Sequence, residues 1–387
     1  MPETATGPAP IAETAAGPAP TVETVAAIGA GVPDGRPFRL GFLLHLDSDL
    51  APAVAYRQAI DLFVAAERLG YDSGWVIHRH FRQGNEHVSS PLVLLAAIAE
   101  HTTRIRLGTG VFVLPLADPL AVAEDAAVLD GLSGGRLELG VGSGPFPTAW
   151  EAFGRSVEDR HRLFDESVTR LHEILEGRPV NSAGEVLHPP GAEVRRRLWQ
   201  ATTGDPARAV GAAVAAARAG DGLQLSRAGD WAGRQSARRQ ADIVAAYHDA
   251  ATGAGHEPRV QISRAVYPHP DRAEAVRAVT PGVRRWQSWA AKDRDAGGLD
   301  VREYLERDRS LLGPPEALAE SLAADPALAQ VTDLLVSFVP GVPDFEEHLR
   351  LLTATARDLA PLLGWCPLQD SRTHSRAHRP SQGIPPP

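Results

Sequence analysis

IRLGTGVFVLPLADPLAVAEDAAVLDGLSGGRLELGVG, from Ile105 to Gly142, contains one complete strand–helix–strand pattern. Its first part (105–113) and its last part (136–142) are nearly continuous apolar runs. Such runs are typical of parallel strands that helices cover on both faces of a sheet. Between the two runs, Asp118 and Pro119 pair a capping carboxylate with a proline at the first helical position, which predicts the start of a helix. The stretch therefore predicts two parallel strands joined by a helix.

The same alternation recurs along the chain, and eight apolar runs are interpreted as strands. They are residues 38–44, 73–79, 105–113, 136–142, 198–203, 221–227, 260–267 and 332–339. Eight strand–helix units in about 330 residues predict a (β/α)8 TIM barrel, whose usual size is about 250 residues before insertions. The alternative is a doubly wound open sheet, which normally carries a glycine-rich turn after its first strand, but here HLDSDLAP follows that strand. We therefore expect an α/β protein with a single barrel domain.

The two ends of the chain differ in composition from the part between them. Residues 1–36 are rich in alanine, proline, glycine and threonine, and residues 366–387 have the same character. Segments with so few large apolar residues cannot offset their ordering entropy by burial, so we expect both to be disordered tails. The predicted barrel occupies residues 37–365.

The overall composition excludes several classes of protein. The 387 residues include 39 Lys and Arg against 48 Asp and Glu, a formal charge of −9, so a general nucleic-acid or anionic-membrane binder is not expected. A single cysteine, Cys366, permits no intrachain disulfide and no thiolate-rich metal site. No apolar run approaches the roughly 18 residues of a membrane-spanning helix, and the N-terminus lacks the features of a signal peptide. These observations predict a cytoplasmic protein.

In a (β/α)8 barrel the active site lies at the mouth, the end where strands stop and helices begin. The stretch WVIHRHF carries His78, Arg79 and His80 to this end, and His45 follows the first strand. The three histidines could bind a metal, but the arginine among them would repel it and no acidic cluster supports it, so we expect no metal site. Histidines at a strand end can also have no role.

Alternating glycines mark the end of the fourth predicted strand, in GGRLELGVGSG from Gly134 to Gly144. They can let a ligand approach the backbone closely, or they can form a tight corner of the barrel. The residues alone leave both interpretations open.

A possible phosphate site lies in WQATTGDPARA, from Trp199 to Ala209. The amides at a helix start, together with nearby threonine hydroxyls, suit a phosphate, and the next strand brings Ser226 and Arg227 within reach. Asp205 could instead simply cap its own helix, and its carboxylate would repel an anion.

Together, the stretches AERLGYDSGWVIHRHF, RIRLGTGVFVLPLADPLAVAEDAAVLDGLSGGRLELGVGSG and WQATTGDPARA resemble the bacterial luciferase-like monooxygenases, which are flavin-dependent (β/α)8 barrels. The resemblance extends from about Phe38 to Trp365. It implies reduced FMN, or a related deazaflavin coenzyme, at the mouth of the barrel. The cofactor-binding residues that it implies are Gly110 and Val111 at an unusual cis peptide, Gly142, Ser143 and Gly144 along the flavin, Thr203, Gly204 and Arg160 at the phosphate, and Ser226 and Arg227 next to it.

The stretch HRHF departs from this family at one position. Luciferase-type members commonly carry Glu-His-His-Phe there, so Arg79 occupies the place of their first, catalytic histidine. An arginine stays protonated and cannot act as a base, but it can pair with an anionic substrate or stabilise a developing oxyanion. The resemblance implies that Arg79 points into the flavin pocket, and because strand side chains alternate, we then expect His78 and His80 to point toward the surrounding helices or loops. The candidate catalytic residues are Arg79, His80 and His45.

Three functions agree with this site. The first, which we favour, is a monooxygenase that receives reduced FMN from a separate flavin reductase and uses oxygen to oxidise a small organic substrate. The second is a deazaflavin-dependent oxidoreductase that transfers hydride without oxygen. The third is a non-catalytic flavin-binding barrel or dimer partner. For the enzyme we expect a homodimer.

Overall fold

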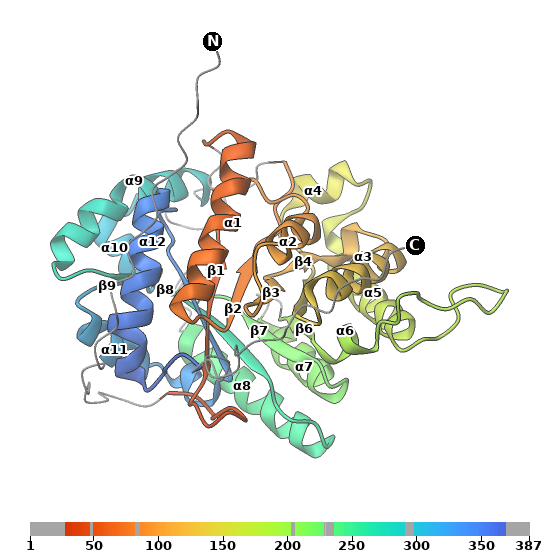
Figure 1. Cartoon of the computed structure of the whole chain (residues 1–387). Coiled ribbons are helices and arrows are strands. Elements are labelled where there is room, and N and C mark those ends of the chain that lie inside the picture. The colour runs from red at the N-terminus through yellow and green to blue at the C-terminus, as the bar shows by residue number, and fades with distance from the viewer. Residues whose placement is uncertain are drawn as a thin grey trace, which may run out of the picture.

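The strands form a closed parallel barrel surrounded by helices (Figure 1). The computed structural model describes residues 28–46, 49–81, 86–202, 206–227, 229, 236–290 and 298–368. The strands of the barrel are β1 (Arg39–Leu44), β2 (Ser73–Val76), β3 (Arg106–Thr109) with β4 (Phe112–Val113), β5 (Leu137–Gly142), β6 (Leu198–Ala201), β7 (Gly222–Leu225), β8 (Val260–Pro268) and β10 (Asp333–Ser337). Strand β10 pairs in parallel with both β8 and β1, which closes the sheet. The predicted TIM barrel is confirmed, and each predicted strand is present.

Two strands are shorter or more divided than the apolar runs predicted. The run 105–113 is split into β3 and β4, and the peptide bond between Gly110 and Val111 in the gap is cis. The run 73–79 is paired only as far as Val76. Beyond that point the backbone N–H of Arg79 donates to the carbonyl of Val88, so the chain pairs with its own returning segment. A short additional strand, β9 (Leu311–Gly313), pairs with the end of β8.

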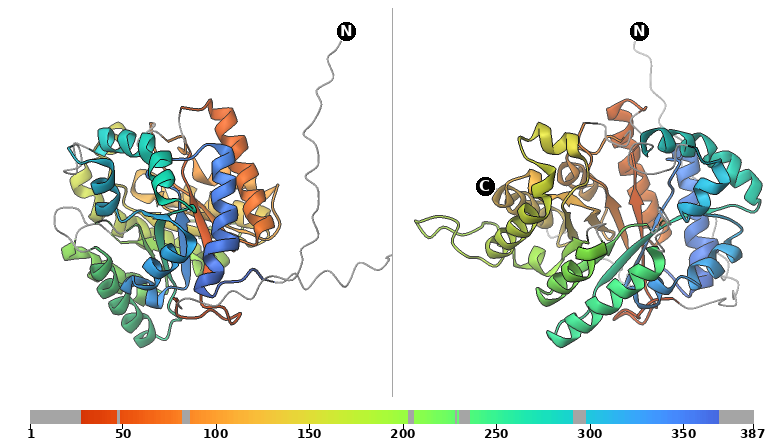
Figure 2. Two further views of the ribbon diagram at one scale, coloured as in Figure 1. Left: turned by 90° about the vertical axis from the view of Figure 1, so that its left-hand side faces the viewer. Right: turned by 180° about the vertical axis from the view of Figure 1, so that it is seen from behind.

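The helices form an outer layer around the strands in every view (Figure 2). They are α1 (Pro52–Leu69), α2 (Pro91–Ala99), α3 (Pro119–Ser133), α4 (Pro147–Ala152), α5 (Arg160–Leu175), α6 (Ala192–Arg196), α7 (Pro206–Arg218), α8 (Ser236–Gly253), α9 (Arg272–Ala290), α10 (Val301–Arg307), α11 (Pro315–Ala323) and α12 (Phe345–Ala354), with short turns η2 (Leu114–Leu116), η3 (Val157–Asp159), η5 (Pro326–Gln330), η6 (Thr355–Leu359) and η7 (Ala360–Leu363). Asp118 caps α3 by accepting from the N–H of Leu120 at 2.8 Å, as its sequence predicts. Asp205 lies outside the described residues.

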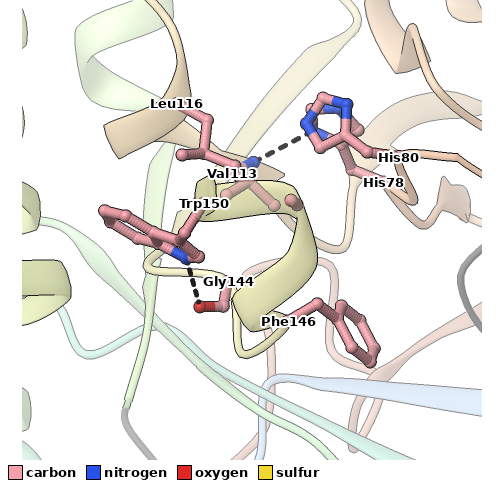
Figure 3. A pocket seen from close by; sticks show the side chains of 8 residues that line it. His78, His80, Val113, Leu116, Gly144, Phe146 and Trp150 are labelled. Carbon is pink, nitrogen blue, oxygen red and sulfur yellow. Dashed lines mark hydrogen bonds between the residues drawn. The ribbon is translucent and has the colours of Figure 1, made fainter. Parts of the chain in front are cut away.

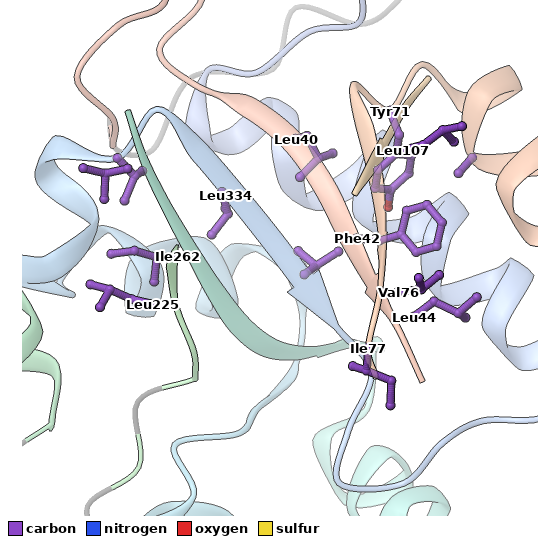
Figure 4. Close-up of a cluster of buried hydrophobic side chains, with 14 of the residues drawn as sticks. Leu40, Phe42, Leu44, Tyr71, Val76, Ile77, Leu107, Leu225, Ile262 and Leu334 are labelled. Atoms are coloured by element: carbon purple, nitrogen blue, oxygen red, sulfur yellow. The ribbon is translucent and has the colours of Figure 1, made fainter. Parts of the chain in front are cut away.

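Apolar side chains pack on both sides of the sheet. Outside the barrel, Phe42 of β1 contacts Phe63 of α1 edge to face, within the large cluster that also contains Leu40 and Leu334 (Figure 4). Inside the barrel, Trp75 and Trp199 meet at right angles with ring centroids 5.9 Å apart. The strands alternate between these two environments, which fixes the direction of each side chain near the mouth.

The N-terminal boundary of the packed region lies earlier than the composition predicted. Residues 28–36 were expected to be part of a disordered tail, but Ile28 is buried and the N–H of Gly29 donates to the carbonyl of Leu328. Arg36 forms an ion pair at 2.8 Å with Asp72, and both side chains are buried. The composition of residues 28–36 did not indicate this packing, because it depends on a single arginine, Arg36, whose partner Asp72 belongs to the barrel.

We predict that Gly108→Ala destabilises the protein, because an added Cβ would lie 2.1 Å from the ring of Trp75 inside the barrel. The expected loss is about 2 kcal/mol of unfolding free energy, measured by urea denaturation. Gly131→Ala in α3 is the control, since a Cβ there meets nothing within 4 Å and should stabilise the helix slightly. Equal stability of the two variants would contradict this account of the barrel interior.

Candidate functional site

A buried carboxylate joins two basic side chains at the mouth of the barrel. Oε1 of Glu86 forms a hydrogen bond with Nδ1 of His45, and Oε2 of Glu86 forms an ion pair at 3.2 Å with Nε of Arg79. The Glu86 side chain is 1% exposed, whereas that of Arg79 is 23% exposed. The arginine therefore supplies the permanent charge that a buried carboxylate needs, and it still reaches solvent at the mouth.

The chain segment after β2 brings Glu86 to this place. It returns across the ends of β1 and β2: the N–H of His87 donates to the carbonyl of Leu46, and the carbonyl of Val88 accepts from Arg79. Tyr56 of α1 anchors the segment by donating its hydroxyl to the carbonyl of His87 at 2.9 Å. The sequence did not single out Glu86, because a lone glutamate in a loop carries no pattern. Its only indication was its place in the loop that follows a candidate strand end.

Arg79 and His45 lie on the same side of the barrel wall. Leu43 and Trp75 pack inside the barrel, and beyond the ends of their strands Glu86 contacts both His45 and Arg79. The guanidinium of Arg79 lies 5.1 Å from the ring centroid of Phe146, a cation–π distance. The structure thus brings together two of the three candidate catalytic residues.

His78 and His80 line a pocket between the end of β2, the η2 turn and α4, and Phe146, which Arg79 contacts, lines the same pocket (Figure 3). Their rings are 4.4 Å apart, and the N–H of Val113 donates to Nδ1 of His78 at 3.1 Å. His80 contacts the ring of Phe153 at 4.8 Å. Their described contacts therefore do not join them to Glu86 or His45. The pocket is lined by His78, His80, Val113, Leu116, Gly144, Phe146, Ala149 and Trp150.

Burial keeps this histidine pair neutral. It lowers the pKa of His78 to about 3, with a smaller contribution from the nearby charge of His80, and it lowers the pKa of His80 as well. Because Nδ1 of neutral His78 accepts a backbone N–H, its proton lies on Nε2. That nitrogen is therefore not available to a metal. Among the described residues, no group of three or more His, Cys, Asp or Glu side chains is arranged to hold one.

The glycine segment packs tightly against the strand beside it. A Cβ at Gly142 would lie 2.5 Å from the side chain of Val111, and one at Gly144 would lie 2.5 Å from Val113. Gly144 also has a positive φ of 69°, which favours glycine. A close barrel corner thus accounts for both glycines, and contact of this segment, including the half-buried Ser143, with a ligand stays a prediction.

The residues expected at the phosphate are only partly within the described chain. Thr203 and Gly204 lie outside the described residues, and Ser226 is exposed just after β7. Arg227 forms an ion pair with Asp308 and lies 5.1 Å from the ring of Trp286. Arg160 begins α5 and donates to the ring of His161 at 3.1 Å. No described contact joins Arg160 to Arg227.

None of the helices among the described residues is long and apolar enough to cross a membrane.

The architecture is thus a closed parallel (β/α)8 barrel with charged side chains at the strand ends. The chain belongs to the luciferase-like monooxygenase family, whose model matches residues 38–330. This confirms the family that the sequence resembled.

Individual relatives include both oxygenases and a deazaflavin enzyme. The chain is 37% identical over 149 residues to 4-hydroxyprotoasukamycin monooxygenase of Streptomyces nodosus subsp. asukaensis, which covers 38% of this chain and only 40% of that protein. It is 27% identical over 343 residues to an F420-dependent glucose-6-phosphate dehydrogenase of Mycolicibacterium gilvum, covering 81% and 96% of the two chains. The FMN complex of the oxygenating constituent of 3,6-diketocamphane monooxygenase, from the CAM plasmid of Pseudomonas putida, shares the fold, with a TM-score of 0.67, 19% identity and 85% and 99% coverage.

The neutral buried histidine predicts a loss of stability in acid. Unfolded histidine has a pKa near 6.5 and His78 one of about 3, so the unfolded state binds the proton first as the pH falls. Stability should therefore decline from about pH 6.5 downward, and His78 should contribute about 1.4 kcal/mol to the loss between pH 7.5 and 5.5.

Urea denaturation at the two pH values measures this contribution. His78→Asn, which keeps an acceptor for the Val113 N–H, should lose less stability than the wild type over this interval. His256→Asn changes an exposed histidine and should lose as much as the wild type. An unchanged pH dependence in His78→Asn would contradict the buried, neutral state of this ring.

Proposed function

We propose that the chain is a flavin-dependent monooxygenase that uses reduced FMN and oxygen to oxidise a small organic substrate. The observation that carries the proposal is the pair of basic side chains, Arg79 and His45, fixed around Glu86 at the mouth of a luciferase-like barrel. A charged group that is held in place and partly shielded from water can stabilise negative charge that develops on a reacting oxygen.

The residues of the mouth suit a planar ring with a phosphate tail. In the proposal, the segments 110–111 and 142–144 contact the ring system. Arg160 at the N-terminus of α5, a helix of 16 residues, and the exposed hydroxyl of Ser226 provide donors for an anion. Thr203, Gly204 and Arg227 complete this set, and Arg227 would share its charge with Asp308. When bound, FMN would supply the electrons that activate oxygen.

Arg79 takes the electrostatic role in this proposal. Its guanidinium has a permanent charge, is anchored on one side by Glu86, and lies over the ring of Phe146. It can therefore orient an anionic substrate group or stabilise an oxyanion, but it cannot accept a proton. In this proposal His80 has a packing role, because its ring contacts the rings of His78, Phe81 and Phe153.

A second candidate is a deazaflavin-dependent oxidoreductase on the same barrel. It is favoured by the match to the F420-dependent dehydrogenase, which extends over 81% of this chain, whereas the match to the monooxygenase covers 38%. Hydride transfer would need the same open mouth and no oxygen.

We further propose a cytoplasmic homodimer supplied with reduced FMN by a separate flavin reductase. The dimer is supported by Val93 of α2 and by Val128 and Leu132 of α3, large apolar side chains that are 71%, 49% and 56% exposed on adjacent helices. The free, exposed Cys366 agrees with a reducing compartment.

Cofactor titration followed by oxygen consumption tests the proposal. We expect FMN to bind at least tenfold more tightly than riboflavin, because charge-assisted hydrogen bonds to the phosphate contribute about 1.5–3 kcal/mol each. With reduced FMN and a panel of small substrates, oxygen uptake should depend on substrate. Turnover only with reduced or oxidised F420, under strictly anaerobic conditions, would favour the second candidate, and equal affinity for FMN and riboflavin would remove the phosphate site.

A further inference from the structure

We infer that Glu86 is a positioning residue that presents His45 as the proton acceptor of the site, in place of the base that Arg79 cannot provide. This inference rests on the proposed function and deepens it, because it specifies a substrate that carries a hydroxyl group.

The hydrogen bond between the two side chains fixes the tautomer of His45. A carboxylate has only acceptors, so Nδ1 of His45 must donate the proton to Oε1 of Glu86. In the neutral ring the lone pair then lies on Nε2, at the opposite edge of the imidazole. An oriented carboxylate–histidine pair of this kind is the general arrangement by which proteins prepare a histidine to accept a proton.

Arg79 makes a buried carboxylate at this position sustainable. Glu86 is 1% exposed, and an isolated buried carboxylate would instead take up a proton or destabilise the fold. The ion pair from Nε of Arg79 to Oε2 leaves Oε1 for His45. Arg79 cannot act as a base itself, but its charge stabilises the carboxylate of Glu86. That carboxylate in turn orients His45.

The surroundings of His45 contain no second carboxylate among the described contacts. The ring faces Trp286 of α9 at 6.2 Å between centroids, with Arg227 over the same tryptophan and paired to Asp308. His348 of α12 is a further titratable neighbour among the described residues, and its pKa is lowered to about 3, first by burial and then by the charge of His45. His348 is therefore neutral near pH 7, and among the described residues Glu86 is the carboxylate that orients His45.

The proton transfer is balanced by groups already at the mouth. The O–H bond of the substrate breaks, its electron pair stays on the oxygen, and the proton forms a new N–H bond at Nε2 of His45. The resulting imidazolium faces Glu86, while the substrate oxyanion faces the guanidinium of Arg79. A phenol, an enol or an alcohol has the hydroxyl proton that this step removes. The same deprotonation would serve an oxygenation that follows it, or a hydride transfer to a deazaflavin that accompanies it.

The tautomer can be measured in the cofactor-free protein by NMR of ¹⁵N-histidine-labelled samples. The His45 signals are assigned by their loss in His45→Gln. We expect Nδ1 of the neutral ring to carry the proton, with the ¹H resonance of that proton strongly downfield, and the unprotonated Nε2 to have the more downfield ¹⁵N resonance of the two ring nitrogens. A proton on Nε2 of the neutral ring would overturn the inference. This readout needs no substrate and no turnover.

Steady-state kinetics of Glu86→Gln, His45→Gln and the double variant test the role of the pair. If Glu86 acts through His45, each single variant should lose at least tenfold in kcat with KM and flavin Kd changed less than threefold, and the double variant should be no slower than His45→Gln. Additive losses, or a loss confined to KM, would overturn it. Full activity of His45→Gln would do the same.

Glu138→Gln is the matched control. Glu138 is also a buried glutamate, bonded to Arg106 and to Nε1 of Trp199, but it lies at the opposite end of the barrel. It should lower the melting temperature without lowering kcat, which separates loss of stability from loss of positioning; an equal fall of kcat in this variant would overturn the inference. If the wild type turns over with neither coenzyme, the proposed function fails, and the NMR result still decides the orientation of His45.

Discussion

The pairing of β10 with both β8 and β1 is the constraint on which the site depends. On its other side β1 pairs directly with β2 in a fixed register, with Leu44 opposite Val76. His45 and the residues after Val76 therefore emerge at one point of the rim. The indole rings of Trp75 and Trp199 pack against each other inside the barrel, below the mouth.

The stretch HRH divides its side chains between two environments. Arg79 joins His45 and Glu86 at the mouth, whereas His78 and His80 stack against each other behind it. Each environment is chemically consistent with its residue types: a buried carboxylate needs the permanent charge of arginine, and two adjacent imidazoles in an apolar pocket stay neutral. Arg79, at the position where the sequence resemblance implies a histidine, thus has a carboxylate partner.

The fold could be predicted from the sequence, because apolar periodicity is a local property, whereas the direction of Arg79 was expected from the family resemblance. Glu86 could not be predicted, since its role depends on a loop that returns across two strand ends. The same holds for Arg36, whose partner Asp72 lies in a different part of the chain and draws residues 28–36 into the packed region. The ends of strands were predicted too long wherever the chain leaves the sheet but stays apolar, as at Ile77.

The central claim is that Arg79, and not His80, belongs to the reacting centre. Single-turnover rates with saturating reduced cofactor test it most directly, in Arg79→Ala and His80→Ala side by side, with Arg79→Lys and Arg79→His completing the series. We predict at least a tenfold loss in Arg79→Ala, about 1.4 kcal/mol, with cofactor affinity preserved, and a rate near that of the wild type in His80→Ala. Normal turnover in Arg79→Ala together with an inactive His80→Ala would contradict it.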